Sequence, residues 1–180
     1  MQAHKEFDIV VYGATGFTGS LVAEYLLERY GCDRELRWAV AGRSQAKLDA
    51  LKAQLGEGAA SLDIVVADSA DRAALTEMAN RTRVVITTVG PYALYGSALV
   101  AACVEAGTEY CDLAGEVQWS RRMIDRHHER AGETGARIVH CSGFDSIPMD
   151  MGVYFLQREA RQRFDAYCEN IALFVKATQG

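Results

Sequence analysis

The stretch VVYGATGFTGS, Val10 to Ser20, decides how this chain folds, because three glycines follow an apolar run at intervals of three residues. Gly13 permits a tight turn after a strand, and Gly16 lets the backbone come close to a pyrophosphate. Gly19 lets the following helix pack against the strand. The alternative is a strand-to-helix turn without a ligand. A strand before the turn and a helix after it favour nucleotide binding, with phosphates at the helix N-terminus.

Apolar and amphipathic segments alternate along the rest of the chain. The expected strands are 7–13, 36–43, 62–68, 83–90, 108–115 and 136–143. The expected helices are 18–30, 44–55, 71–81, 96–107, 117–135 and 149–161. In the first helix, apolar residues at helical spacing predict one buried face, formed by Leu21, Val22, Tyr25 and Leu26. The pattern predicts an α/β fold, a doubly wound parallel Rossmann sheet of about six strands in the order 3-2-1-4-5-6 with helices on both faces.

A domain boundary is expected near residue 162. Residues 1–162 then form an NAD(P)-binding Rossmann domain, which is long enough to bury a sizeable core. A further β-like run, CENIALFVKATQG, begins at Cys168 and reaches the last residue of the sequence. A strand without a partner is an unfavourable way for a domain to finish. We therefore expect residues 163–180 to begin a following substrate domain that is truncated in this sequence.

Composition argues against several classes of protein. The net charge of −5 gives no electrostatic footprint for nucleic acid, and no apolar run approaches the roughly 20 residues that span a bilayer. Five cysteines without tight spacing read as reduced thiols and favour a cytoplasmic protein. No metal site is expected, since His127 and His128 are adjacent on a helix and point about 100° apart. The sequence is compatible with a homo-oligomer and does not specify one.

The residues after the second expected strand indicate whether the cofactor is NAD(H) or NADP(H). An NAD site needs Asp or Glu there for the ribose 2′-OH, but this chain has AGRSQAK. Arg43 can pair with a 2′-phosphate or stack on adenine, and Ser44 can donate to the same phosphate. The alternatives are that Arg43 is only an exposed charge and that Ser44 only caps the next helix. Because the acid is missing, NADP(H) is the predicted cofactor.

Further cofactor contacts are expected at the carboxyl ends of the third and fourth strands, the edge where open α/β sheets bind ligands. Asp68 can accept a hydrogen bond from the adenine amino group. The alternative is that Asp68 or Ser69 caps the next helix. The run TTVGPY then lines the path of the ribose and nicotinamide with Thr88, Val89, Gly90 and Pro91.

Candidates for nicotinamide or substrate contacts lie in the loops GPYALYG, YCDLAGE and CSGFDSIP; they are Tyr92, Tyr95, Asp112, Glu116 and Asp145. Asp112 can equally cap a turn, and Asp145 or Ser146 can begin a helix before Pro148. No catalytic residue is assigned, because no tyrosine is followed four residues later by the lysine that short-chain dehydrogenases use. His140 is expected at an inward or edge position, without a partner that the sequence identifies.

The motifs GATGFTG, AGRS, GPYALYG, YCDLAGE and GFDSIPMD together resemble the saccharopine dehydrogenase-like oxidoreductases, a group that includes bacterial trans-acting enoyl reductases. The resemblance covers almost the whole chain, with Met149 as a minor departure. It implies an NADP-binding Rossmann domain followed by a substrate domain. It also implies a set of cofactor-binding residues, namely Gly13, Thr15, Gly16, Phe17, Thr18, Arg43 and Ser44, with Gly90 and Pro91 near the nicotinamide.

These observations predict the cofactor domain of an NADP(H)-dependent oxidoreductase that transfers hydride to or from a small or lipid-like substrate. The chain by itself is expected to be inactive, because half of the substrate crevice is missing. The alternative is an NADP-sensing regulator without turnover, which would not need elaborated loops after the fifth and sixth strands. A sugar-nucleotide epimerase is disfavoured by the missing tyrosine and lysine pair.

Overall fold

The computed structural model describes residues 5–32 and 36–176. Six parallel strands form one sheet in the order β3-β2-β1-β4-β5-β6, which confirms the predicted α/β Rossmann architecture. The strands are β1 (Phe7–Tyr12), β2 (Trp38–Gly42), β3 (Asp63–Val66), β4 (Thr82–Thr87), β5 (Glu109–Asp112) and β6 (Ile138–Val139). β1 and β4 pair at the centre of the sheet, and Tyr12 lies opposite Thr87 at the carboxyl ends of the two strands.

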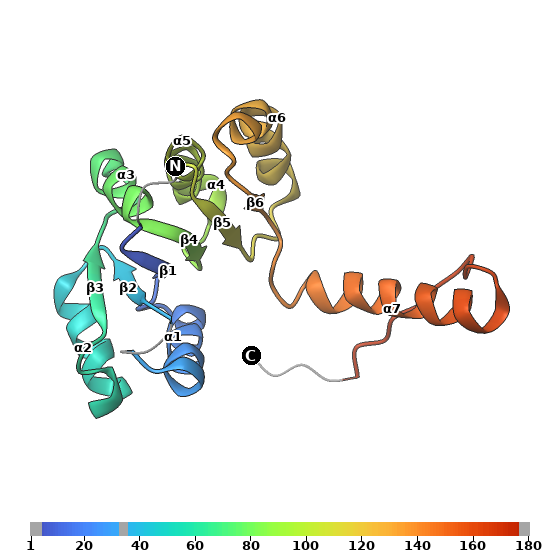
Figure 1. Ribbon diagram of the computed structural model, residues 1–180, viewed down its shortest axis with the longest axis horizontal. Helices are drawn as coiled ribbons and strands as arrows, with labels where there is room; N and C mark the ends of the chain where they lie inside the picture. The colour runs from blue at the N-terminus through green and yellow to red at the C-terminus, as the bar shows by residue number, and fades with distance from the viewer. Residues whose placement is uncertain (1–4, 33–35, 177–180) are drawn as a thin grey trace.

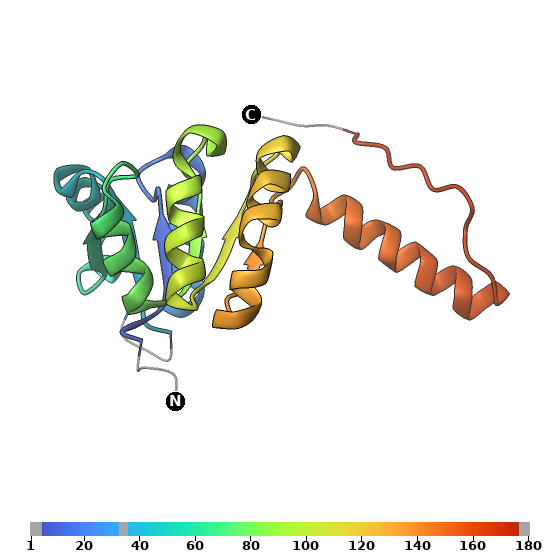
Figure 2. The same cartoon turned by 90° about the horizontal axis from the view of Figure 1, so that it is seen from above.

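Helices cover the sheet on its two faces (Figures 1 and 2). One group consists of α1 (Phe17–Tyr30) and α2 (Gln45–Leu55), followed by the short helix η1 (Glu57–Ala59). The opposite group consists of α3 (Arg72–Arg81), α4 (Tyr92–Tyr95), α5 (Ser97–Ala106) and α6 (Val117–Thr134). The helix after β1, α1, covers one face of the sheet, and the helix before β5, α5, covers the other. This change of face leaves a crevice between β1 and β4.

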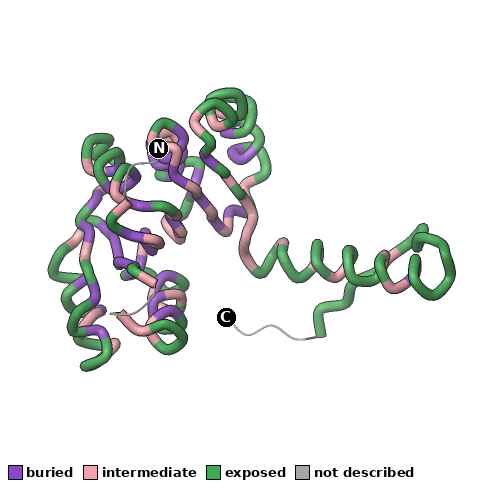
Figure 3. The backbone as a smooth tube through the Cα atoms, in the orientation of Figure 1, coloured by how far each residue is buried: buried purple, intermediate pink, exposed green. Residues whose placement is uncertain are grey.

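Alternation along the strands divides the core into two clusters. Val10 and Tyr12 of β1 pack with the α3, α5 and α6 side, whereas Val11 packs with the α1 and α2 side. Successive side chains of a strand point to opposite faces, so a strand with helices on both sides buries nearly every residue. Figure 3 shows this burial concentrated along the strands.

The first helix packs through smaller residues than its sequence pattern predicts. Gly19, Ala23 and Leu26 are its buried residues. Leu21 and Tyr25, which were expected on the buried face, are 50% and 59% exposed. A helix that approaches a sheet through glycine and alanine lies too close to it for large side chains at the contact. The prediction is therefore confirmed for Leu26, which is buried, and for Val22, which packs against the core, and is wrong for Leu21 and Tyr25.

The carboxyl-terminal part differs from the expectation in the length of β6 and in the absence of a strand over residues 168–176. β6 is only two residues long, because the chain leaves the sheet after Val139 to wrap around Asp112. After it, α7 (Ile147–Phe164) projects away from the sheet (Figure 1). The described residues 168–176 of the expected β-like run form no strand, and 177–180 lie outside the described residues. Gln157 instead ties this segment to α7, because its side-chain amide pairs with the backbone N–H and carbonyl of Cys168 at 2.8 and 3.1 Å.

No helix among residues 5–32 and 36–176 is long and apolar enough to cross a membrane. Within the same residues, no group of three or more His, Cys, Asp or Glu side chains is placed to hold a metal ion.

Candidate functional site

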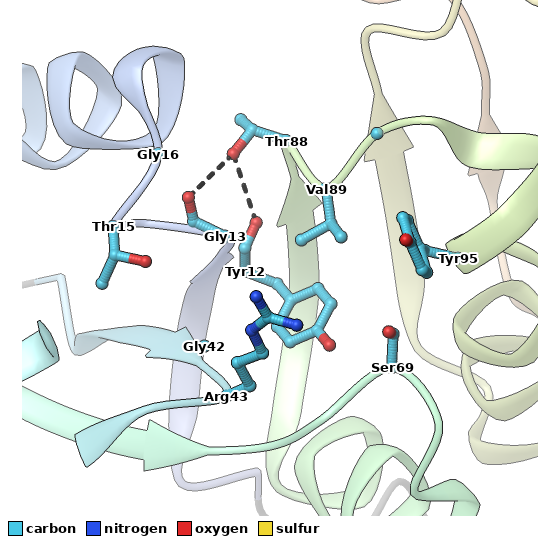
Figure 4. A pocket seen from close by; sticks show the side chains of 11 residues that line it. Tyr12, Gly13, Thr15, Gly16, Gly42, Arg43, Ser69, Thr88, Val89 and Tyr95 are labelled. Atoms are coloured by element: carbon cyan, nitrogen blue, oxygen red, sulfur yellow. Dashed lines mark hydrogen bonds between the residues drawn. The ribbon is translucent and has the colours of Figure 1, made fainter.

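A cavity of about 300 Å³ opens at the carboxyl ends of β1, β2 and β4, at the crevice where the two groups of helices diverge (Figure 4). Its lining residues come from the ends of β1 and β2, from the loops after β1 to β4 and from α4; they are Tyr12, Gly13, Thr15, Gly16, Gly42, Arg43, Ser69, Thr88, Val89, Gly90 and Tyr95. Open α/β sheets bind ligands at this position. The cavity is hereafter called the switch-point cavity.

The turn after β1 depends on two glycines whose side-chain positions are already occupied. Gly13 has a φ of +88°, and a Cβ there would lie 2.7 Å from Cγ2 of Val89. A Cβ on Gly19 would press against the carbonyl oxygen of Gly13 and lie 2.8 Å from Cα of Ala14. Gly13 thus makes the turn, and Gly19 lets α1 begin directly against it, as the glycine spacing predicts.

Gly16 has a different role, because a Cβ there would meet only the Gly13 carbonyl oxygen, at 3.4 Å. Gly16 is the N-cap of α1, and no side chain caps the helix there. The first N–H groups of a helix have no partner within the helix, and together with the helix dipole they attract anions. The N-terminus of α1 therefore presents N–H groups without a side-chain cap beside the switch-point cavity.

The loop after β4 is held against this turn. Thr88 donates its backbone N–H to the Tyr12 carbonyl at 2.9 Å. Its hydroxyl also contacts the carbonyls of Gly13 and Tyr12, at 3.2 and 3.4 Å (Figure 4). These bonds fix the spacing between the loops that follow β1 and β4, and Val89 and Gly90 continue along the cavity wall.

Arg43, Ser69 and Tyr12 form the polar side of the switch-point cavity (Figure 4). Burial and the charge of Asp68 raise the pKa of Tyr12 to about 12, while Arg43 and the Ser69 hydroxyl act in the opposite direction. Arg43 itself is exposed, and it takes part in none of the salt bridges between described residues. Its guanidinium thus remains available to an anionic ligand in the cavity.

Ser44 and Asp68 have local structural contacts. Ser44 is the N-cap of α2, and its hydroxyl accepts a hydrogen bond from the Lys47 N–H at 3.4 Å. Asp68 accepts from the Ala70 N–H at 2.8 Å, so it closes a turn after β3. The idea that Asp68 or Ser69 caps α3 is wrong, because Asp71 caps it by accepting from two backbone N–H groups.

The structure brings half of the predicted cofactor residues to the switch-point cavity, namely Gly13, Thr15, Gly16, Arg43 and Gly90. The other half lie outside its lining: Phe17, Thr18, Ser44, Asp68 and Pro91. Phe17 lines a neighbouring hollow with Lys47, on the outer side of the turn. Sequence reasoning missed Tyr12, Gly42 and the cavity-facing position of Ser69. Tyr12 could have been found from strand alternation, which places it on the face opposite Val11.

Of the five candidates for nicotinamide or substrate contacts, only Tyr95 lines the switch-point cavity. Tyr92 is buried, donates to the Thr87 carbonyl and accepts from the Leu113 N–H. Glu116 accepts from the N–H groups of Tyr92 and Ala93, at 2.6 and 2.8 Å, and thus fixes the start of α4. Asp145 is exposed, one residue before Ser146, the N-cap of α7, where a helix start was predicted.

Asp112 is the centre of a buried hydrogen-bond network at the end of β5. One carboxylate oxygen accepts from the Tyr110 hydroxyl at 2.8 Å and contacts Nδ1 of His140 at 2.7 Å. The other accepts from the N–H groups of Ala114 and Cys141, both at 3.0 Å. Burial raises the pKa of Asp112, but these hydrogen bonds outweigh burial and hold it below its ordinary value. Asp112 thus serves the turn, as the alternative reading allowed, and supplies the partner that His140 lacked in the sequence.

The chain matches the saccharopine dehydrogenase NADP binding domain family over residues 9–139. It belongs to this family. A trans-acting enoyl reductase of Mycobacterium ulcerans (strain Agy99) is 51% identical over 160 residues, which cover 89% of this chain and 38% of the relative. A trans-acting enoyl reductase of Mycobacterium tuberculosis (strain ATCC 25618 / H37Rv) is 49% identical over 158 residues, which cover 88% of this chain and 37% of the relative. The chain thus spans less than two fifths of these relatives' length.

Two solved structures share the architecture of this chain. Apo saccharopine dehydrogenase (L-Glu forming) from Saccharomyces cerevisiae has a TM-score of 0.66 at 18% identity, over 86% of this chain and 32% of that chain. Pen from Bacillus thuringiensis has a TM-score of 0.58 at 12% identity, over 76% of this chain and 50% of that chain. At these identities the likeness shows the fold alone.

Proposed function

We propose that this chain is the cofactor-binding part of an NADP(H)-dependent oxidoreductase. The observation that carries the proposal is Arg43, an exposed cation without a salt-bridge partner among the described residues, at the end of β2 and on the wall of the switch-point cavity. An NAD site places a carboxylate at this end of β2, whereas an arginine accommodates the 2′-phosphate of NADP. The family name is consistent with this cofactor.

The proposed roles follow from position around the switch-point cavity. Gly13, Gly16 and the N-terminus of α1 face the pyrophosphate, with Thr15, Phe17 and Thr18 at the rim of the same turn. Arg43 holds the 2′-phosphate, while Ser44 and Asp68 lie close to the adenosine end. Gly90 and Pro91 lead toward the nicotinamide, which supplies or accepts the hydride when the cofactor is bound. The residues of this chain therefore bind and orient the dinucleotide.

The experiment is calorimetric titration of the chain with NADPH and, separately, with NADH. We expect Arg43→Ala to weaken NADPH binding by roughly ten- to a hundredfold, about 1.5–3 kcal/mol, because a charge-assisted contact to the 2′-phosphate is lost. NADH binding should change by less than about threefold, since NADH has no such phosphate. Arg121→Ala, at an exposed arginine of α6 that pairs only within its own helix, is the matched control.

Equal affinity of the chain for the two dinucleotides, or equal losses for both in Arg43→Ala, would contradict the assignment of the 2′-phosphate to Arg43. An unchanged NADPH affinity in Arg121→Ala is required before a loss in Arg43→Ala is attributed to the cavity rather than to net charge.

The variant Gly16→Ala tests whether Gly16 is needed for phosphate binding or only for the turn after β1. A methyl group at this position fits the folded chain, since its nearest neighbour outside the adjacent residues is 3.4 Å away. In the proposed site the pyrophosphate comes close to this backbone segment at the N-terminus of α1. We expect a thermal midpoint within about 4 °C of the parent chain, equivalent to less than about 1 kcal/mol. NADPH affinity should fall at least about tenfold, or about 1.4 kcal/mol. Unchanged affinity would show that Gly16 serves only the turn.

The substrate is proposed from the relatives. Both mycobacterial relatives described above bear the name trans-acting enoyl reductase. We infer a small or lipid-like substrate with a reducible double bond, held between the Tyr95 side of the switch-point cavity and a substrate domain that begins after residue 162. The isolated chain should bind NADPH without consuming it, whereas a longer chain with the substrate domain should oxidise NADPH in the presence of an enoyl thioester. Binding without turnover in the longer chain would favour an NADP sensor.

The proposed setting is the reducing cytoplasm, with a small molecule as the partner and a homo-oligomer as a compatible assembly. No disulfide joins cysteines in the described part of the chain, and Cys103, Cys111, Cys141 and Cys168 are thiols. Burial raises the pKa of Cys103 to about 12, and burial with the charge of Asp112 raises that of Cys111 to about 11. Both thiols are therefore poorly reactive at neutral pH, which fits a role in packing.

A further inference from the structure

Helix α1 presents an apolar stripe to solvent. Phe17 is 80% exposed, and Leu21 and Tyr25 follow it at intervals of four residues, each at least half exposed. Residues at this spacing lie on one side of a helix. Glu24 and Glu28 continue the same side through the second half of α1; both are exposed, and neither takes part in a salt bridge between described residues. These five residues are hereafter called the α1 stripe.

Helix α7 presents a second stripe of the same kind. Ile147, Met151, Tyr154 and Phe155 recur at helical spacing and are 43–59% exposed. Arg158 continues this side of the helix, and its guanidinium lies over the Phe155 ring, 5.6 Å from the ring centroid. These five residues are hereafter called the α7 stripe. Exposed apolar residues that adjoin one another in this way mark an interaction surface.

The α1 stripe and the α7 stripe do not meet within one chain. Helix α7 projects away from the sheet and lies apart from α1 in both views (Figures 1 and 2). Figure 3 shows most of α7 exposed along its length. Aromatic residues, methionine and arginine are the residue types enriched at protein interfaces, and they make up most of the α7 stripe.

The charges on the two stripes are opposite. Glu24 and Glu28 lie in the second half of α1, whereas Arg158 lies in the second half of α7, with Arg161 close to it on the same side. Both arginines form ion pairs only with acids that follow them in the chain, at 3.7 and 3.3 Å. A parallel alignment of α1 and α7 brings their apolar first halves together and sets the glutamates against the arginines. Opposite charges across an interface select the partner and fix the register.

We propose that a second copy of this chain covers both surfaces: the α7 stripe of one protomer packs on the α1 stripe of its partner, and a two-fold axis repeats the contact. Each copy then gives one α7 and receives another, as a closed symmetric dimer requires. Helix α1 has 14 residues, so each contact runs about 21 Å along the helix. The dimer buries four helical surfaces, which brings the buried area nearer to the roughly 1,600 Å² of a standard interface than a single helix pair would.

Sedimentation velocity of the 180-residue chain, without nucleotide, tests this dimer independently of the proposed cofactor site. The parent chain should pass from monomer to dimer between about 1 and 200 µM, which corresponds to a dissociation constant in the micromolar range. Phe155→Asp places a carboxylate in the apolar half of the contact and should raise this constant at least about tenfold. Phe164→Asp is the matched control, since Phe164 is an exposed phenylalanine of α7 nine residues away, about half a revolution around the helix. It should dimerise as the parent does.

Charge reversal identifies which helices pair. Glu24→Arg combined with Glu28→Arg sets arginines against arginines, and Arg158→Glu combined with Arg161→Glu sets glutamates against glutamates. Each double variant alone should raise the dissociation constant at least about tenfold. In an equimolar mixture of the two double variants, both contacts of the mixed dimer again join opposite charges. The mixture should therefore dimerise within about threefold of the parent chain.

Arg121→Glu combined with Arg122→Glu, at two exposed arginines of α6, is the control for net charge and should dimerise as the parent chain does. A parent chain that remains monomeric at about 200 µM would overturn the proposal and would leave the two stripes to a different partner. A dimer that the α7 reversal weakens and the α1 reversal leaves unchanged would pair α7 with α7, which also contradicts it. Failure of the mixture to dimerise would overturn the proposed pairing of α1 with α7.

Discussion

We expect Gly19→Ala to lower the free energy of unfolding by about 3 kcal/mol, the upper part of the range for an overpacked core. The added methyl group would press on the carbonyl oxygen of Gly13 and lie 2.8 Å from Cα of Ala14. Both obstacles are backbone atoms of the turn that β1 and α1 share, so no side chain can rotate away. Relief requires α1 to move off the sheet and to lose the packing of Ala23 and Leu26.

Urea unfolding followed by circular dichroism measures this loss. Gly132→Ala is the matched control, because Gly132 lies within α6 and a Cβ there has no neighbour within 4 Å. Alanine in an open helical position should stabilise the chain by up to about 1 kcal/mol. A Gly19→Ala chain as stable as its parent would mean that the contact between α1 and β1 is looser than the structure shows.

Asp112→Asn should cost about 3 kcal/mol of unfolding free energy at neutral pH, because a buried acceptor of four hydrogen bonds is replaced by a group that cannot accept all of them. The Tyr110 hydroxyl or Nδ1 of His140 would then face an amide N–H₂ group. The backbone bond from Cys141, which ends β6, would also weaken. Asp145→Asn, at an exposed carboxylate two residues before α7, should change stability by less than about 0.5 kcal/mol.

The stability lost in Asp112→Asn should become smaller as the pH falls. Hydrogen bonds lower the folded pKa of Asp112 from an ordinary value of 3.8. A depressed folded pKa contributes stability that is complete above the ordinary pKa and disappears as the pH falls through the folded pKa. The difference between parent and variant should thus shrink as the pH falls below about 4. A difference that grows on acidification would show that Asp112 is not ionised in the folded chain.

Local pattern was sufficient for the sheet because each strand carries its own apolar signal and several of the turns contain a glycine, such as Gly13, Gly31 and Gly56. The order 3-2-1-4-5-6 then follows from alternating strands and helices. The short length of β6 could not be predicted from the local sequence pattern. Its end depends on Cys141, which turns out of the sheet at a φ of +61° to donate to Asp112, a residue 29 positions earlier. A partner so distant in sequence leaves no trace in the spacing of nearby residues.

In the candidate site too, features set by neighbouring residues could be predicted, and features set by distant residues could not. The positions of Gly13, Gly16 and Arg43 on the cavity wall could be predicted, because they follow from the residues next to them in sequence. Glu116 could not, because its partners are the backbone N–H groups of Tyr92 and Ala93, which any residue other than proline would present. From the sequence, Glu116 is a carboxylate beside a predicted crevice. In the structure, the same carboxylate caps the first N–H groups of α4. An acidic residue in a loop can serve the backbone as readily as a ligand.

Four of the residues that line the switch-point cavity are glycines, namely Gly13, Gly16, Gly42 and Gly90. Much of the floor of this cavity is thus peptide backbone, whose chemistry is the same in every sequence that adopts the fold. The adjustable chemistry is confined to a few rim side chains such as Arg43 and Ser69. On the proposed assignment, an exchange of Arg43 for an acid would change the preferred dinucleotide while the turn and the sheet stay unchanged. Ligand preference and foldability would then depend on different residues of the same cavity, the rim side chains for the first and the glycine backbone for the second.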